Sequence, residues 1–95
     1  MAQPFLTFAI DNTKQYAVVA RTYCWRILIQ ENYNSATPPT ADIQQFNPDG
    51  SGPVNIAKGT PAIFSTGPYL PGQTAGFVNT PSGSITVQQI ESMKI

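Results

Sequence analysis

The chain has 95 residues with five Lys or Arg, five Asp or Glu, no His and one Cys, so its formal net charge is zero. This length predicts one domain over residues 1–95, and the lack of excess positive charge argues against binding to nucleic acid or a membrane surface. Without His there is no imidazole base or His metal ligand, and one Cys forms neither an internal disulfide nor a thiolate zinc site.

Uncharged polar side chains take the place of the missing charges. Ten Thr, eight Gln, six Asn and six Ser make up about a third of the chain. Hydrophobic residues account for 41% and aromatic residues for 11%, which is enough to form a buried core, and nine Pro and seven Gly supply turns. The composition predicts a small folded domain that gains stability from association with other copies.

No segment has the pattern of a signal peptide or a membrane span. The apolar run Phe5–Ile10 is too short and has no basic flank, and the longest apolar-rich stretch, residues 16–29, contains Arg21 and Arg26. We therefore expect synthesis in a reducing compartment, with Cys24 buried as a small apolar residue.

The first third of the chain predicts strands. Phe5–Ile10 is rich in aromatic and branched residues, and residues 11–14 form a turn. Residues 15–30 predict two strands with a break or bulge near Arg21 and Thr22, although their length also allows a helix. Alternation assigns to the core face Ala17, Val19, Arg21, Tyr23, Trp25, Ile27 and Ile29.

The remainder alternates short strands with turns rich in Gly and Pro. A long loop over residues 31–41 comes first. In the last strand Ile85, Val87 and Gln89 share one face, and Ile90 breaks the alternation, which predicts a bulge or a frayed end. The strands are expected at residues 42–46, 54–56, 62–64, 74–80 and 85–91, and the turns at residues 47–53, 58–61, 67–73 and 81–84.

Strands at intervals of about ten residues predict an all-β fold. The expected architecture is a small single-domain antiparallel β-sandwich or barrel, jelly-roll-like, with long loops. Such a fold displays edge strands to which a partner's strand can be added. The apolar segments Phe5–Ile10 and Ile90–Ile95 are the candidates for that pairing.

The ionisable residues give little sign of catalysis. Glu31 with Asp42, or Asp11 with Glu91, would form a carboxylate pair of the kind that glycosidases use, but turn residues flank most of these acids and favour capping roles. Residues 47–52 resemble a calcium loop, yet only Asp49 is charged there, so a plain turn is favoured. We predict no enzyme, no catalytic residue, no metal site and no cofactor.

Aromatic and Arg side chains are the candidate contact residues. Arg21 and Arg26 interrupt an apolar stretch, as solvated side chains or as contacts to a ligand or a second subunit. Trp25 is expected in the core, whereas Tyr33 and Tyr69 lie in predicted loops and are expected at a contact surface for protein or sugar. The predicted interface residues are Phe5, Phe8, Arg21, Arg26, Tyr33 and Tyr69.

Three segments of the C-terminal half resemble small virion proteins encoded in tailed-bacteriophage structural operons. They are Val54–Phe64 (VNIAKGTPAIF), Tyr69–Val78 (YLPGQTAGFV) and Gly83–Glu91 (GSITVQQIE). The resemblance implies a capsid decoration, or cement, protein of the virion, made in the host cytoplasm. It implies binding to the major capsid protein or other virion proteins, as a homo-oligomer (trimer or dimer).

Low charge is consistent with this function, because like charges repel when identical contacts are repeated over a lattice. Two alternatives stay open. One is a carbohydrate-binding or host-recognition module, motivated by Trp25, Tyr23, Tyr33 and Tyr69. The other is a tail or connector component of the virion.

Overall fold

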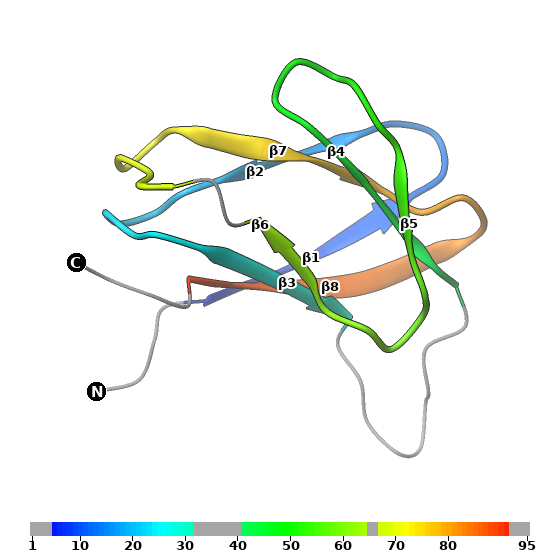
Figure 1. The fold of residues 1–95 in the computed structure, drawn as a ribbon. Coiled ribbons are helices and arrows are strands. Elements are labelled where there is room, and N and C mark those ends of the chain that lie inside the picture. Colours follow the sequence, from blue (N-terminus) through cyan, green and yellow to red (C-terminus); the bar gives the residue numbers. More distant parts are fainter. Residues whose placement is uncertain (1–4, 32–40, 65–66, 92–95) are drawn as a thin grey trace.

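Eight antiparallel strands form two stacked sheets in the computed structural model, which describes residues 5–31, 41–64 and 67–91 (Figure 1). These residues contain no helix, and so none that could cross a membrane. The strands are β1 (Phe5–Asp11), β2 (Tyr16–Val19), β3 (Ile27–Glu31), β4 (Ile43–Phe46), β5 (Val54–Ile56), β6 (Ala62–Phe64), β7 (Thr74–Asn79) and β8 (Ser84–Glu91).

The strand order is that of a jelly roll. Sheet A has the order β1-β8-β3-β6 and sheet B the order β2-β7-β4-β5, with every pairing antiparallel. Successive strands cross between the sheets except at the β4–β5 hairpin, which is how a jelly roll closes two sheets over one core. The predicted all-β sandwich is confirmed as one compact domain, with Cα extents of 34 × 32 × 17 Å.

The core lies between the sheets and follows the alternation of each strand. Sheet A contributes Ile10, Ile27, Ile29 and Val87, each at most 1% exposed. Cys24 is also fully buried, as expected of a small apolar side chain. Facing them from sheet B are the buried side chains of Val18, Ile43, Ala75 and Val78.

Residues 15–30 form two strands with a break, as predicted, and the helical alternative is wrong. The predicted core face is correct in β3, where Ile27 and Ile29 are buried, but wrong in β2, where Val18 is buried and Ala17 exposed. The irregular segment 20–26 separates the two strands. The buried side chains before it and within it, Val18, Ala20 and Cys24, have even numbers, whereas Ile27 and Ile29 have odd numbers, so one alternation cannot describe both strands.

Strand β8 is regular, so the bulge expected at Ile90 is wrong. Its pairing with β1 runs without a shift from Ser84 to Ile90, and its pairing with β3 continues to Glu91. Ile90 lies on the face opposite Val87 and is half-buried. Because β8 lies between β1 and β3, Ile90 is paired on both edges and cannot add to a partner's sheet. Residues 92–95 lie outside the described residues.

Glycine permits a close approach between the sheets at β7. A Cβ atom on Gly76 would lie 2.4 Å from the carbonyl oxygen of Phe46 and 2.7 Å from the ring of Phe64. Phe64 belongs to sheet A and Gly76 to sheet B, so the aromatic ring fills the space that a larger residue on β7 would occupy.

Candidate functional site

A groove of about 340 Å³ opens along one side of the sandwich, between the edge strands of the two sheets. Strand β1 is the edge of sheet A and β2 the edge of sheet B, and each has one backbone edge that no other described strand pairs with. Asn79 holds the turn between them, because its Nδ2 donates to the carbonyl oxygens of Lys14 (2.9 Å) and Asp11 (3.3 Å). The residues that line the groove are Thr7, Phe8, Ala17, Val19, Arg21 and Gln89.

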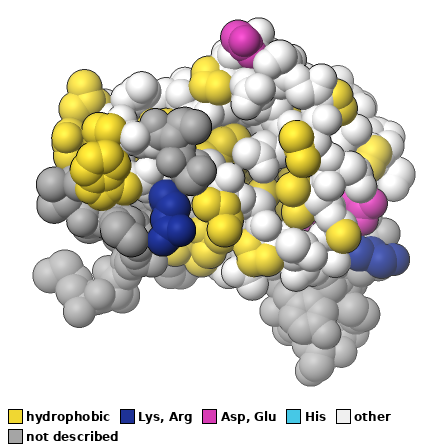
Figure 2. Space-filling model, in the orientation of Figure 1, with side chains coloured by type: hydrophobic (Ala, Val, Ile, Leu, Met, Phe, Trp, Pro, Cys, Tyr) yellow, Lys and Arg dark blue, Asp and Glu magenta, His cyan; other side chains and the backbone are white. Residues whose placement is uncertain are grey.

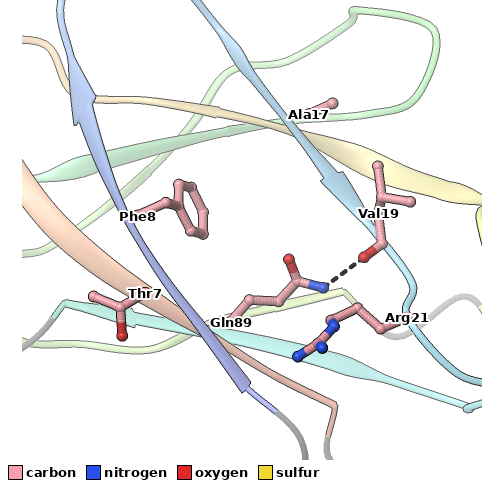
Figure 3. A pocket seen from close by; sticks show the side chains of 6 residues that line it. All are labelled: Thr7, Phe8, Ala17, Val19, Arg21 and Gln89. Carbon is pink, nitrogen blue, oxygen red and sulfur yellow. Dashed lines mark hydrogen bonds between the residues drawn. The ribbon is translucent and has the colours of Figure 1, made fainter.

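Gln89 forms the polar floor of this groove. It lies on the core face of β8 and is 3% exposed. Its Nε2 donates a hydrogen bond to the carbonyl oxygen of Val19, 2.6 Å away (Figure 3). This bond satisfies a carbonyl group of β2 beyond the register shift between Val18 and Val19 and links the two sheets where their edges diverge.

The other side chains divide the groove into an apolar and a cationic part. The ring of Phe8 points into the space between β1 and β2, and the guanidinium group of Arg21 lies beside the Gln89 amide (Figure 3). Val19 and Ala17 line the groove from β2. The lining therefore offers apolar contact together with an amide and a guanidinium, which can bind carbonyl or carboxylate oxygens.

Binding is the chemistry that this lining supports. The six lining side chains are apolar, hydroxyl, amide or guanidinium groups, which can contact a ligand and hydrogen-bond to it. The groove can therefore hold an extended, partly apolar segment.

Two of the predicted interface residues meet in this groove. Phe8 comes from β1 and Arg21 from the segment after β2, and the fold brings both to one opening. Phe5 is the first residue of β1, but the structure describes only its backbone and not its side chain. Sequence reasoning did not propose Gln89 as a site residue, although an amide at a core-face position of β8 was a usable signal.

The other predicted contact residues are not in the groove. Arg26 is exposed in the segment that leads into β3. Tyr69 is only 3% exposed, so its expected exposure is wrong; its backbone pairs with that of Cys24, which places the ring in the core. Trp25 is 43% exposed, so its predicted place in the core is also wrong. Tyr33 lies outside the described residues.

The exposed aromatic side chains gather at one end of the sandwich. The connection between β2 and β3 lies beside the one between β6 and β7, joined by hydrogen bonds from Ala20 N to Gln73 O (2.9 Å) and from Gly72 N to Ala20 O (2.8 Å). Figure 2 shows hydrophobic side chains clustered at the left of the view, where these connections lie in Figure 1. We call this the end patch; its exposed residues are Tyr23, Trp25 and Leu70.

Of the two carboxylate pairs considered, one forms and one does not. Asp11 and Glu91 lie near opposite ends of sheet A, because Asp11 pairs with Ser84 at the start of β8 while Glu91 ends that strand. Glu31 and Asp42 are close enough for the charge of Asp42 to raise the pKa of Glu31. Only this second pair is a candidate for shared chemistry.

The Glu31–Asp42 pair is occupied by backbone and amide donors. Burial is the main cause of the raised pKa of Glu31, whose Oε1 accepts from the Gly59 N–H at 3.2 Å. The pKa of Asp42 is lowered, chiefly by the Asn55 side chain (Nδ2 to Oδ2, 3.1 Å) and then by the Lys58 N–H (to Oδ1, 2.8 Å). The pair thus anchors the turn between β5 and β6.

The segment that resembles a calcium loop is a turn closed by its own hydrogen bonds. Asp49 Oδ1 accepts from the Ser51 N–H (2.9 Å) and the Ser51 hydroxyl (2.6 Å), and Asn47 Nδ2 donates to the same hydroxyl (2.9 Å). Within the described residues, no group of three or more acidic or Cys side chains is arranged to hold a metal ion. The carboxylate of Asp49 therefore stabilises this turn through hydrogen bonds to Ser51, in agreement with the predicted turn.

No protein-family model and no curated protein sequence matches this chain.

Proposed function

We propose that the protein is a non-enzymatic structural component of a virion, a decoration protein that binds the major capsid protein or another shell protein and stabilises subunit junctions. The observation that carries the proposal is the groove between β1 and β2. It combines a Phe8 wall, a Gln89 floor and the Arg21 cation between two edge strands.

The physical support is the match between this groove and an extended protein segment. A strand that runs along an edge gains main-chain hydrogen bonds, and its alternate side chains point to one side. An apolar side chain of that strand would enter beside Phe8, and a carboxylate or carbonyl would accept from Arg21. Strand addition of this kind involves no chemical step.

The virion assignment also rests on the sequence resemblance. The residues that carry it fall on β5, β6, β7 and β8 and on the turns between them. Jelly rolls occur in viral capsid proteins and in lectins, and a fold by itself does not specify a function. The groove therefore supports the mode of binding, while the resemblance motivates the identity of the partner.

The test uses particles of the virus whose genome encodes this chain. Ala17→Arg places a long cation in the groove from an exposed position, and Ala57→Arg is the matched control at an exposed turn position away from the groove. We expect the wild type to be present in purified particles and to co-sediment with particles stripped of it. Ala17→Arg should weaken this binding at least about tenfold, with Ala57→Arg unchanged.

Two results would overturn the proposal. One is the absence of the protein from purified particles together with no co-sedimentation. The other is equal binding by Ala17→Arg and the wild type, provided that circular dichroism shows the variant to be folded; particle binding would then use another surface.

The end patch favours a second candidate, carbohydrate binding. Trp25 is 43% and Tyr23 40% exposed, and exposed aromatic faces can stack on sugar rings. The test is a glycan array with the wild type, Trp25→Ala and, as the control for an exposed apolar residue elsewhere, Val54→Ala. Binding that Trp25→Ala abolishes and Val54→Ala retains would support this function, and a blank array would contradict it.

A further inference from the structure

The outward face of sheet A carries an apolar row across neighbouring strands. Leu28 on β3 is the direct cross-strand partner of Ile90 on β8 and of Ile63 on β6. These side chains point away from sheet B, because their neighbours Ile27, Ile29 and Phe64 face the core. Ile63 is 48% exposed and the other two are half-buried, so the row is open to solvent in the single chain.

The next row on the same face consists of uncharged polar side chains. Gln88 on β8 pairs with Thr7 on β1 and with Gln30 on β3. Amide and hydroxyl groups each contain both a donor and an acceptor, so such a side chain can bond to a copy of itself. Among the described outward side chains of β8, β3 and β6 none is charged, and Asp11 lies at the far end of β1.

We propose that this face of sheet A binds the same face of a second copy of the chain, as a dimer with twofold symmetry. In such an interface both copies contribute the same surface patch, so a patch with charges of one sign would face those same charges on the partner and repel it. Aliphatic and self-complementary amide side chains avoid that repulsion. The inference does not depend on binding to a virion, since it concerns the opposite side of sheet A from the core and a different occupant from that of the groove.

The face is the size of a small interface. Its strands have 7, 8, 5 and 3 residues, which at about 3.3 Å per residue and about 4.8 Å between strands cover on the order of 360 Å² in projection. Projecting side chains raise the accessible area above the projected area, towards the ~600 Å² per partner at the lower end of standard interfaces. An interface of this size predicts a reversible dimer whose population depends on concentration.

Sedimentation equilibrium over a concentration series tests the proposal. The wild type should approach twice the monomer mass of 10.3 kDa at high concentration. Ile63→Arg, on the edge strand β6, should raise the dimer dissociation constant at least about tenfold, because it buries a cation against an apolar row. Val54→Arg is the matched control: Val54 is 58% exposed on β5 of the other sheet, and its substitution should leave association unchanged.

A second variant guards against loss of folding by Ile63→Arg. Gln88→Glu places a negative charge on both faces of the interface, so its association should be weakest at low salt and recover as salt screens the repulsion. A wild type that stays monomeric throughout would overturn the proposal, as would folded Ile63→Arg and Gln88→Glu proteins that associate like the wild type. A monomeric wild type whose particle binding is lost in Ile63→Arg would instead assign this face to the shell protein.

Discussion

The side-chain amide of Gln89 on β8 donates a hydrogen bond to the backbone carbonyl of Val19 on β2, 2.6 Å away, and thereby joins the two sheets across the core. Both residues line the groove between β1 and β2. Gln89 is 3% exposed, so its amide is withdrawn from water and the bond to Val19 replaces a bond to solvent. The floor of the candidate site is therefore also part of the structure that keeps the sheets in register.

Gln89→Leu removes this donor while keeping a similar volume. We expect it to lower the free energy of unfolding by about 0.5–1.5 kcal/mol, the net contribution of one hydrogen bond. The measurement is urea denaturation followed by Trp25 fluorescence. Gln44→Leu, on the outward face of β4 in the other sheet, is the control and should change stability by less than about 0.5 kcal/mol. Equal effects of the two substitutions would show that the bond to Val19 contributes little.

Gly76→Ala tests the close approach of the two sheets. The added Cβ would lie 2.4 Å from the Phe46 carbonyl oxygen and 2.7 Å from the Phe64 ring, so the backbone of β4 or β7 must move. We expect a loss of about 1–3 kcal/mol, as in other overpacked cores. Gly72→Ala is a useful comparison, because its Cβ would meet nothing within 4 Å although its φ is +88°. Thermal unfolding should show a larger loss for Gly76→Ala; the reverse order would refute the packing argument.

Glu31→Gln should stabilise the protein at neutral pH. Burial raises the pKa of Glu31 in the folded state, so its ionisation disfavours folding, and stability is lost as the pH rises through the folded pKa. Gln cannot ionise and still offers an oxygen to the Gly59 N–H. Denaturation midpoints between about pH 3.5 and 8 should show the variant above the wild type at neutral pH, with the gap closing below the ordinary Glu pKa of 4.5. A constant gap at all pH values would contradict this account.

Asp42→Asn should show the opposite pH dependence. Hydrogen bonds from Asn55 and Lys58 lower the pKa of Asp42 in the folded state, so its contribution to stability is present above the ordinary Asp pKa of 3.8 and lost as the pH falls through the folded pKa. The variant should unfold at lower urea concentration than the wild type at neutral pH. The two curves should converge in acid, and a difference that persists there would show that geometry rather than charge is responsible.

Local patterns in the sequence were sufficient for the strands and turns. The turn Leu70–Gln73 illustrates this: Pro71 followed by Gly72 predicts a tight turn, and the structure has the Gln73 N–H bonded to the Leu70 carbonyl (3.0 Å) with a positive φ at Gly72. Such turns depend on the conformational limits of two adjacent residues. Strands β4, β5 and β6 lie within a residue of their predicted ranges for the same reason.

The exposure of single aromatic residues was not predictable in this way. Tyr69 lies in a connection rich in Gly and Pro, yet it is buried because its backbone pairs with Cys24, 45 positions earlier in the chain. Trp25 sits at an apparent core position and is exposed because the irregular segment before β3 changes the alternation. Both outcomes depend on contacts between distant segments, which the pattern of neighbouring residues does not predict.

The sequence by itself determined the class of this protein: a neutral chain without His, rich in amide and hydroxyl side chains, whose Gly and Pro turns divide it into short strands. Those properties follow from composition and from interactions between neighbouring residues. Only the tertiary structure decided that Phe8, Arg21 and Gln89 line one groove and that Leu28, Ile63 and Ile90 form one row. Strand order and register set these neighbours, because the jelly roll pairs the first strand with the last and brings together residues far apart in the chain.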